Sequence, residues 1–392
     1  MKVLSVNAGS SSLKFQLYNM PEEEVLISGN FERIGIGESF YTLKINGEKI
    51  KKDKELENHA QAFETLVNEL TENKVIESLD EIHGIGHRIV QGGDLFDRTV
   101  VIDDKVLNDI DELSALAPLH NPAAVVGIKA AIKVFPDAVQ TAVFDTAFHQ
   151  TMPEENYLYA LPISWYKDYK VRRYGAHGTS HKFVANRMNE ILGKEDTKLI
   201  TCHIGNGASI SAVLNGKCIN TSMGLTPNAG LIMGTRCGDI DASIIPYVME
   251  KANLTPKDVD TIINKESGLL AISQKSSDSR DIEEGIAAGD KNCILAQKMY
   301  VRRIVDYIAK YYVELGGADA IVFTAGIGEK AIDTRRDVIN ELGALGIYLD
   351  EEANNVRSKE RMISTKDSKV ECWVIPTDEE LMIARDTYKL SK

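Results

Sequence analysis

The sequence predicts an α/β fold built from a duplicated unit that begins with a β-hairpin. Segments typical of strands and of helices alternate along all 392 residues. Two similar segments, VLSVNAGSSSLKFQLY (3–18) and LITCHIGNGASISAVLNGK (199–217), each place two apolar runs on either side of a turn of small residues. Because they lie about half a chain length apart, we interpret them as an internal repeat and expect two α/β domains.

Hydrophobic periodicity and helix start signals place the individual elements. Asn121-Pro122 is a favourable helix opening, because proline suits the first helical position. The amphipathic repeat of 290–315 predicts a long helix with one buried face. Its apolar positions are Ile294, Leu295, Met299, Ile304, Ile308 and Tyr311. The predicted strands are 2–7, 13–18, 25–31, 41–46, 83–89, 139–144, 199–204, 209–214, 320–325 and 370–375. The predicted helices are 57–73, 104–112, 121–134, 178–192, 241–251, 255–264, 281–288, 290–315, 330–341, 350–358 and 377–390.

Composition excludes several classes of protein. A formal net charge of −13 argues against nonspecific nucleic-acid binding, which needs a basic face. The apolar runs are far shorter than the roughly 18 residues of a membrane span, and the N-terminus lacks the order of a signal peptide. The five cysteines are scattered and form no CxxC pair, which favours free thiols in a reducing compartment. We therefore expect a cytoplasmic protein without nucleic-acid or membrane partners.

The two bare turns suggest phosphate binding. Glycine allows a ligand to approach the backbone closely, and successive N–H groups can form an anion-binding concavity. In the first hairpin, Lys14 follows on the second strand and can reach toward a phosphate. The chain has no GxxxxGK[ST] segment, so it is not a P-loop enzyme. One such turn is usually only a turn, but two related copies favour a phosphotransferase.

Two arginines occupy positions typical of anion binding. Arg88 lies at the end of an apolar strand in GIGHRIVQGG, and Arg236 lies in the glycine loop GLIMGTRCGDID ahead of a helix expected from Asp241. An arginine at a strand end or in a glycine loop suggests a planar anion as its partner. The alternative for each is a surface ion pair.

Three further residues are candidates for the same site. His177 in YGAHGTSH lies at a helix start, where a phosphate binds well. Asp145 in AVFDTAFH ends a buried strand, a common place for site carboxylates in α/β sheets, although it could also be a helix N-cap. PTDEELMIARDT reads as a helix capped by Thr377 or Asp378, and Glu379 is an additional candidate for a magnesium-linked ligand.

Two other classes of function remain open from these residues. Gly326, Gly328 and Ala331 fit GxGxxA, and Asp350 follows about 20 positions later, so a dehydrogenase would predict NAD binding and indifference to magnesium. A non-catalytic ATP-binding switch would share the phosphate loops. The second class has no need of Arg88 and Arg236, so their presence favours catalysis.

The chain resembles the acetate and propionate kinase family along nearly its whole length. Ordered matches run from VNAGSSSLKF (6–15) to TDEELMIARDT (377–387), with GHRIV, PLHNP, FDTAFH, YGAHGTSH, HIGNGAS, TSMGLTP, MGTRCGDID and FTAGIGE between them. The resemblance implies two duplicated actin-like (ribonuclease H-like) ATPase domains with an active-site cleft between them. It implies an N-terminal domain of 1–147 plus 376–392 for the carboxylate and magnesium, and a C-terminal domain of 148–375 for the nucleotide and the dimer interface.

The resemblance also implies a reaction and a role for each matching residue. The reaction is reversible, direct in-line transfer of the ATP γ-phosphate to acetate, giving acetyl phosphate and ADP, with Mg²⁺ or Mn²⁺, in a homodimer. The implied transfer residues are Asp145, His177 and Arg236. The implied substrate residues are Arg88, Val90, Leu119 and Pro227. The implied nucleotide residues are Lys14, His203, Ile204, Gly205, Asn206, Gly207, Asp278, Ser279, Arg280, Gly326, Ile327, Gly328, Glu329 and Lys330. The implied metal residues are Asn7 and Glu379.

Departures from the usual family motifs leave open which carboxylic acid is the substrate. The family usually reads HRIVHGG and GFHGTSH, whereas this chain has Gln91 and Ala176 at the corresponding positions. In the family, that aromatic ring helps to wall the pocket around the substrate methyl group. Losing it would leave room for about one to three methylenes at roughly 0.8 kcal/mol each. A propionate or butyrate kinase is therefore the alternative, unless a neighbouring side chain fills the gap.

Overall fold

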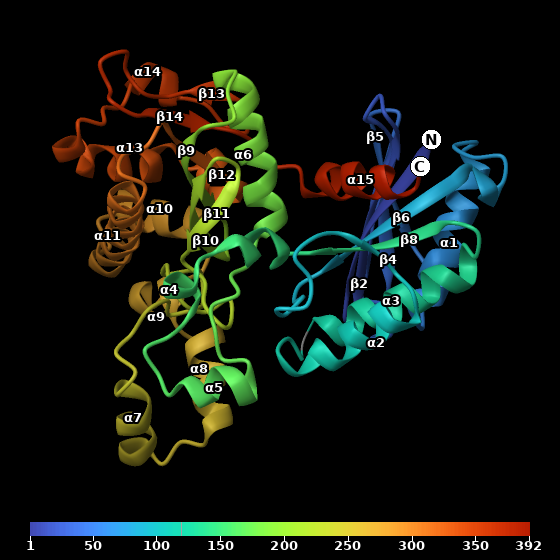
Figure 1. The fold of residues 1–392 in the computed structure, drawn as a ribbon, viewed down its shortest axis with the longest axis horizontal. Coiled ribbons are helices and arrows are strands. Elements are labelled where there is room, and N and C mark those ends of the chain that lie inside the picture. Colours follow the sequence, from blue (N-terminus) through green and yellow to red (C-terminus); the bar gives the residue numbers. More distant parts are fainter. Residues whose placement is uncertain (119) are drawn as a thin grey trace. The chain divides into compact units, whose positions relative to one another are not determined.

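The structure of the protein is a computed structural model, and it describes residues 1–118 and 120–392. Leu119, an implied substrate residue, lies outside the described residues. The chain forms two compact units, which are described separately: unit 1 comprises Met1–Gln150 with Asp378–Lys392, and unit 2 comprises Thr151–Thr377 (Figure 1).

Unit 1 is built on a mixed sheet whose order is β5-β4-β3-β2-β1-β6-β8-β7. Strands β1, β2 and β3 are antiparallel neighbours, whereas β6 is parallel to β1 and β8 is parallel to β6. The strands are β1 (Lys2–Gly9), β2 (Ser12–Asn19), β3 (Glu24–Glu32), β4 (Phe40–Ile45), β5 (Glu48–Asp53), β6 (Ile82–Ile89), β7 (Val100–Val101) and β8 (Val139–Phe144).

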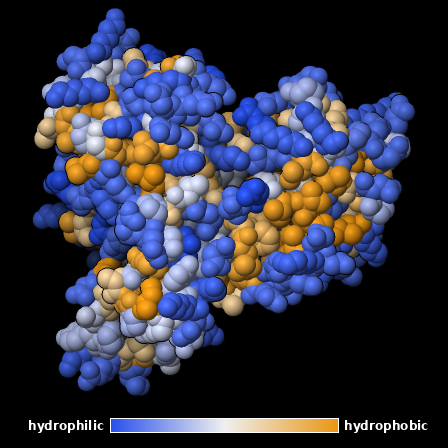
Figure 2. Space-filling view, viewed as in Figure 1, coloured by the Kyte–Doolittle hydropathy of each residue, from blue (hydrophilic) through white to orange (hydrophobic). Residues whose placement is uncertain are grey.

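Helices cover both faces of the central strands in unit 1, because alternate residues of each strand point to opposite faces. Leu4 of β1 packs with Phe63 of α1 (His59–Glu72) and Ala131 of α3 (Asn121–Val134) in one core cluster. Val3, on the other face of β1, packs with Ala384 of α15 (Glu379–Leu390). Helix α2 is Asp104–Glu112. Hydrophobic residues are visible over α3, where Val126 and Ile132 are exposed (Figure 2).

Unit 2 repeats the strand order of unit 1. Its sheet order is β11-β10-β9-β12-β14-β13, in which β11, β10 and β9 are antiparallel neighbours and β12 and β14 continue in parallel with β9. The strands β3-β2-β1-β6-β8 of unit 1 have the same order and the same directions as β11-β10-β9-β12-β14 of unit 2. Both predicted hairpins and the duplication are therefore confirmed. The strands are β9 (Lys198–Ile204), β10 (Ala208–Leu214), β11 (Lys217–Thr221), β12 (Ala320–Thr324), β13 (Arg361–Met362) and β14 (Glu371–Val374).

The long helix of unit 2 is α11, and its buried face is confirmed at Ile304, Ile308 and Tyr311 but was wrongly predicted at its N-terminal end. The predicted positions Leu295 and Met299 are 50% and 41% exposed. Ala296 and Tyr300, one residue further along, are buried instead, since the stripe that faces the core also contains Ile304. The helices of unit 2 are α4 (Glu154–Tyr157), α5 (Ile163–Tyr169), α6 (Gly178–Leu192), α7 (Ile244–Ala252), α8 (Pro256–Lys265), α9 (Gly268–Ser273), α10 (Ser279–Ala287), α11 (Lys291–Glu314), α12 (Ala325–Lys330), α13 (Ile332–Glu341) and α14 (Glu351–Asn354).

The elements absent from the sequence prediction are short or lie at sheet edges. They are the strands β5, β7, β11 and β13 and the helices α4, α5, α9 and α12, together with 3-10 turns at Leu79–Glu81, Leu113–Ala115, Ala147–Thr151 and Gly343–Leu345. β5 reads EKIKKD and has no apolar alternation, because it closes an edge with both faces largely exposed. The five cysteines are free, as predicted. Among residues 1–118 and 120–392, no helix has the length and apolar character needed to cross a membrane.

Candidate active site

The first hairpin places two candidate residues opposite each other in unit 1. Asn7 of β1 pairs in register with Lys14 of β2. Lys14 forms an ion pair with Glu380, in the first turn of α15. The predicted phosphate-binding lysine therefore lies beside the N-terminal end of α15.

Glycines in β6 explain how α15 approaches the sheet so closely. Gly84, Gly86 and Arg88 alternate along β6 and therefore share one face of the sheet. A methyl group on Gly84 or Gly86 would collide with Thr387 and other side chains of α15 and its C-terminal end. The helix thus packs on the two glycines, and its first turn reaches Arg88, whose Nε lies 3.7 Å from Glu379 Oε2.

Arg88 is held by Asp145 from the neighbouring strand. Arg88 Nε donates to Asp145 Oδ1 at 3.1 Å, and Nη2 donates to Oδ2 at 2.7 Å. Asp145 directly follows β8, is 1% exposed, and its own N–H donates to the carbonyl of Ile89 at 2.8 Å. This bidentate geometry fixes the guanidinium plane. Asp145 therefore orients Arg88 and does not cap a helix.

The charges in unit 1 perturb one another. Asp145 holds the pKa of Arg88 above its usual range, with a smaller contribution from Glu379. The pKa of Glu379 is raised to about 7, chiefly by burial; Arg88 opposes this rise, and the charges of Asp145 and Glu380 add to it. Because this carboxylate is buried and also lies near two negative charges, a cation beside it would favour its ionised form.

The implied metal residues fit a magnesium ion that arrives with phosphate. Within the described residues, no group of three or more His, Cys, Asp or Glu side chains could hold a metal. Asn7 and Glu379 offer one amide oxygen and one carboxylate. Magnesium often binds through one or two carboxylates together with substrate phosphates and waters. The donor set is thus compatible with nucleotide-borne magnesium and too small for an all-protein metal site.

Unit 2 places a histidine at the start of a helix. His177 is the N-cap residue of α6 and has a left-handed backbone conformation, with φ of 58°. Its ring stacks on that of His203, with ring centroids 4.0 Å apart and an interplanar angle of 22°. His177 Nδ1 is hydrogen-bonded to Ser209 Oγ at 2.8 Å, and His203 Nδ1 to Ser180 Oγ at 2.8 Å. Both rings are therefore fixed in orientation.

The glycine turn between β9 and β10 brings His177 and Arg236 to one spot. A methyl group added to Gly207 would lie 3.3 Å from Arg236 Nη1 and 3.6 Å from His177 Nε2. The absence of a side chain at Gly207 thus leaves room between these two groups and the turn. This turn, with Gly205 and Asn206, is the second of the two hairpin turns predicted to bind phosphate.

Arg236 is a half-buried cation without a carboxylate partner among the described residues. Its Nη1 donates to the carbonyl of Pro227 at 3.1 Å and contacts Met233 Sδ at 3.7 Å. Burial lowers the pKa of Arg236. A desolvated guanidinium without a counter-ion is stabilised by any anion that binds beside it. Arg88, which is paired with Asp145, differs in this respect.

The predicted nucleotide residues of the polar loop form a helix cap. Asp278 is the N-cap of α10 and accepts from the backbone N–H of Arg280 at 2.9 Å. The exposed Arg280 side chain also donates to both carboxylate oxygens, at 3.0 and 2.5 Å. These bonds lower the pKa of Asp278 to about 2. Ser279 begins the helix, so all three residues are placed by one local structure.

The third glycine segment is helical immediately after its strand. α12 begins at Ala325, whose φ is 66°, and includes Gly326, Ile327, Gly328, Glu329 and Lys330. Glu329 Oε1 accepts from the backbone N–H groups of Ala325 at 3.0 Å and Thr377 at 3.2 Å. A methyl group on Gly326 would meet no atom within 4 Å, so this glycine faces open space. Glu329 therefore serves the backbone, while Gly326 faces outward.

The remaining implied substrate residues have structural contacts. Val90 is half-buried directly after β6, and Pro227 offers its carbonyl to Arg236. Gln91 is buried; its Oε1 accepts from the N–H of Gly93 at 2.9 Å, and its backbone exchanges hydrogen bonds with the Asn121 side chain. Gln91 thus braces the loop after β6.

Comparison with known proteins decides the family. A family model described as the Acetokinase family matches residues 2–385. The chain belongs to the acetokinase family. It is 53% identical over 387 residues to "Acetate kinase 2" of Listeria monocytogenes, covering 98% of each chain. Members are phosphotransferases with a carboxyl group as acceptor, so the dehydrogenase and non-catalytic switch interpretations are wrong.

Solved structures support the fold assignment of this acetokinase family member. The acetate kinase of Porphyromonas gingivalis superposes with a TM-score of 0.96 at 45% identity, covering all of both chains. A propionate kinase from Francisella tularensis superposes with a TM-score of 0.93 at 41% identity, covering 99% of each. The predicted actin-like ATPase fold is therefore confirmed.

Sequence reasoning missed the residues that support the site. The alternation of Gly84 and Gly86 before Arg88 is a readable signal for a close helix, since glycine in a strand often marks a close approach. Ser209, which holds His177, belongs to the glycine-turn segment, but no role was predicted for it. The one feature of the sequence that could have indicated this role is the position of Ser209 on the second strand of the hairpin, directly after the turn.

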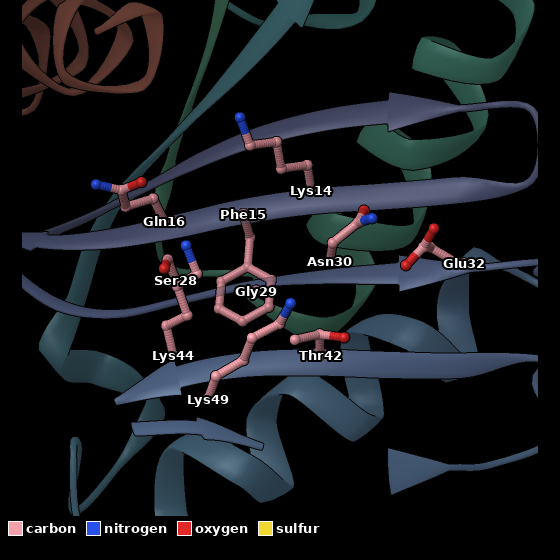
Figure 3. A pocket seen from close by; sticks show the side chains of 10 residues that line it. All are labelled: Lys14, Phe15, Gln16, Ser28, Gly29, Asn30, Glu32, Thr42, Lys44 and Lys49. Carbon is pink, nitrogen blue, oxygen red and sulfur yellow. The ribbon is translucent and has the colours of Figure 1, made fainter. Parts of the chain in front are cut away.

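A polar hollow of about 370 Å³ lies on the sheet of unit 1 (Figure 3). Lys14 lies at its edge, and Lys44 of β4 and Lys49 of β5 extend over it. The two latter residues are paired directly in register, so like charges face each other across the strands. Its other lining residues are Phe15, Gln16, Ser28, Gly29, Asn30, Glu32 and Thr42.

Proposed function

We propose that this chain is an acetate kinase that transfers the γ-phosphate of ATP reversibly to acetate, giving acetyl phosphate and ADP by direct in-line transfer. The observation that carries the proposal is Arg236, a half-buried cation with no carboxylate partner among the described residues, beside His177 Nε2 and the bare turn at Gly207. Phosphoryl transfer depends on positioning and charge neutralisation more than on covalent chemistry. These groups supply positive charge and donors where a phosphoryl group needs them.

Arg88 is the proposed acetate-binding residue. The guanidinium of Arg88 has five N–H donors, and Asp145 accepts from two of them, one on Nε and one on Nη2. The other three donors would bind the carboxylate of acetate. Acetate has a pKa typical of carboxylic acids and is ionised at pH 7, so no strong general base is needed. Asp145 holds Arg88 in the plane that binds the acid.

Glu379 and Asn7 would hold magnesium, which supplies charge neutralisation for the phosphates of ATP when it is bound. Lys14 and the turn from His203 to Gly207 would contact those phosphates through side-chain and backbone N–H groups. The loop at 278–280 and helix α12 would hold the adenosine. The outward-facing Gly326 supports this assignment, because nothing in unit 2 covers it.

The decisive test traps the product. The protein is incubated with ATP, magnesium, acetate and hydroxylamine, and acetyl phosphate is measured as its hydroxamate. We expect hydroxamate from the wild type and a fall in kcat of at least about 10²-fold for Arg236→Ala, the scale for losing one transition-state donor. The control is Arg302→Ala, an exposed arginine of unit 2 paired with Glu341. No hydroxamate from any short acid would refute the proposal.

A longer acid is the second candidate, favoured by Ala176 and by the likeness to a propionate kinase. Ala176 is 4% exposed and belongs to the core cluster of unit 2. If its small size widens the acid pocket, Ala176→Phe lowers the ratio of kcat/KM for butyrate to that for acetate. A ratio that does not fall, in a variant with an unchanged thermal midpoint, would exclude this role.

Homodimerisation through unit 2 is part of the proposal. Large apolar side chains are exposed on and beside α5 and α7, namely Leu161, Ile163, Trp165, Tyr169, Ile240, Ile244 and Tyr247. Exposed apolar groups of this kind are typical of subunit interfaces. Light scattering after size exclusion tests it, with Trp165→Lys and Tyr247→Lys expected to give monomers. A cytoplasmic location stays a prediction.

A further inference from the structure

A chain of hydrogen bonds leads from His177 into the interior of unit 2. His177 Nδ1 is bonded to Ser209 Oγ at 2.8 Å, and the same Oγ is bonded to His181 Nε2 at 2.8 Å. His181 Nδ1 is bonded to Thr201 Oγ1 at 2.7 Å. Ser209, His181 and Thr201 are all fully buried. His181 lies one helical turn after His177 in α6, while Ser209 and Thr201 lie on β10 and β9.

This chain allows two arrangements of its protons, because each hydroxyl and each neutral imidazole has one proton to donate. In the first, Thr201 donates to His181 Nδ1, His181 Nε2–H donates to Ser209, and Ser209 donates to His177 Nδ1. In the second, every bond is reversed, and His177 Nδ1–H donates to Ser209. The direction at the buried end therefore determines which nitrogen of His177 carries the proton.

The buried end favours the first arrangement. Within the described residues, the Thr201 hydroxyl has His181 as its only hydrogen-bond partner. If Thr201 accepted this bond, its own O–H would be a buried donor without an acceptor, which is among the costlier defects in a protein interior. When Thr201 donates, every proton between Thr201 and His177 Nδ1 has an acceptor within the chain.

We propose that Thr201, His181 and Ser209 are positioning residues that hold neutral His177 as the tautomer protonated on Nε2. Nε2 is the nitrogen on the side of Gly207 and Arg236. In this tautomer His177 presents an N–H donor there, and the opposite tautomer presents a lone pair that repels an anion. The inference rests on the proposed function in one respect: the anion is the phosphoryl group being transferred.

The tautomer can be observed without any assay of activity. In ¹⁵N-labelled wild-type protein at a pH where His177 is neutral, long-range ¹H–¹⁵N spectra distinguish protonated from unprotonated ring nitrogens. The signals of His177 are assigned by their absence in His177→Gln. We expect a protonated Nε2 and an unprotonated Nδ1. A protonated Nδ1 would overturn the proposal.

A matched pair of variants tests the remote end of the chain. Thr201→Val removes the hydroxyl and keeps the shape, whereas Thr201→Ser keeps the hydroxyl and removes a methyl group. For Thr201→Val we expect kcat for acetyl phosphate formation to fall about 3- to 10-fold, with KM for ATP changed less than twofold, and His177 Nδ1 to become partly protonated. Thr201→Ser should keep the wild-type tautomer and kcat within about twofold.

Ser209→Ala removes the bond to His177 itself and should lower kcat by at least about tenfold, with Ser209→Thr restoring part of it. Equal kcat and tautomer in Thr201→Val and wild type would overturn the proposal. Equal losses of kcat in Thr201→Val and Thr201→Ser would also overturn it, because that pattern indicates packing alone. A wild-type protein with the Nε2–H tautomer but no acyl phosphate would support the tautomer assignment and refute the acetate kinase proposal.

Discussion

Buried His87 makes the stability of unit 1 sensitive to acid. This residue precedes Arg88 in β6, is 2% exposed, and its Nε2 lies 2.8 Å from Gln140 Oε1. The amide nitrogen of Gln140 donates to the carbonyls of Phe135 and Ala138 at 3.3 Å each, so Oε1 is the acceptor and His87 donates. Burial lowers the pKa of His87 from 6.5 to about 4.

The sign of the effect follows from proton binding. Between pH 6.5 and about pH 4 the unfolded chain protonates this histidine, and the folded protein does not. The unfolded state thus binds more protons, and the free energy of unfolding falls as the pH falls through this window. With 1.36 kcal/mol for each pH unit between the two pKa values, the full loss is about 3 kcal/mol.

Replacing His87 with glutamine removes this titration. The amide nitrogen of the introduced glutamine can take the place of Nε2 and donate to Gln140. Both tryptophans lie in unit 2, so the stability of unit 1 is best measured by hydrogen exchange of peptides spanning β6. Between pH 7 and pH 4.5 the free energy of unfolding of unit 1 should fall by about 2 to 3 kcal/mol more in the wild type than in His87→Gln. The exposed His83 of the same strand provides the control, and His83→Gln should behave as the wild type. Equal losses in the wild type and His87→Gln would refute the reasoning.

Three further predictions follow from single contacts. Gly207→Ala places a methyl group 3.3 Å from Arg236 Nη1 and should lower kcat about tenfold in the hydroxamate assay, with an unchanged thermal midpoint. Lys49→Glu puts a negative charge opposite Lys44 in place of a positive one, and should raise the free energy of unfolding of unit 1 by about 0.2–1 kcal/mol. Arg335→Met removes four buried hydrogen bonds to carbonyl oxygens and should destabilise unit 2 by at least about 3 kcal/mol, measured by tryptophan fluorescence in urea.

Matched variants separate these effects from general perturbation. Gly343→Ala, at a position without a positive φ and with no atom within 4 Å of the added methyl group, should leave kcat unchanged. Lys49→Gln should raise the free energy of unfolding of unit 1 by less than Lys49→Glu does. Equal increases in the two variants would contradict a charge-pair effect. Arg336→Met, at a half-buried neighbour paired with Glu351, should cost less than about 1 kcal/mol, and a loss equal to that of Arg335→Met would contradict the role of full burial.

The prediction of elements from sequence succeeded where a local pattern specifies them. The helices at 104–112, 121–134 and 178–192 have the predicted bounds, because caps and apolar periodicity act within one or two turns. The strand β5, rich in lysine, carries no such pattern, since its place at a sheet edge is decided by its partner β4. The prediction for the buried stripe of α11 was wrong at Leu295 because neighbouring apolar residues fit two adjacent stripes equally well.

The candidate residues were found in sequence, but their partners were not. Motifs identified Arg88 and Asp145 separately, and the bond between them joins residues 57 positions apart on adjacent strands. A histidine at a helix start indicates phosphate binding, yet the proton position on His177 depends on Ser209, 32 positions away. Contacts of this range leave no periodic signal in the sequence.

The sequence by itself determined the family and the two hairpins and proposed the residues of the candidate site, because glycine turns and helix caps are set by neighbouring residues. Only the tertiary structure decided how charges are compensated: Arg88 is paired with Asp145, whereas Arg236 lacks a carboxylate partner among the described residues. The physical reason is that charge compensation depends on which side chains come within a few ångströms in the folded sheet. Burial then amplifies the difference, raising the pKa of Glu379 and lowering that of Arg236.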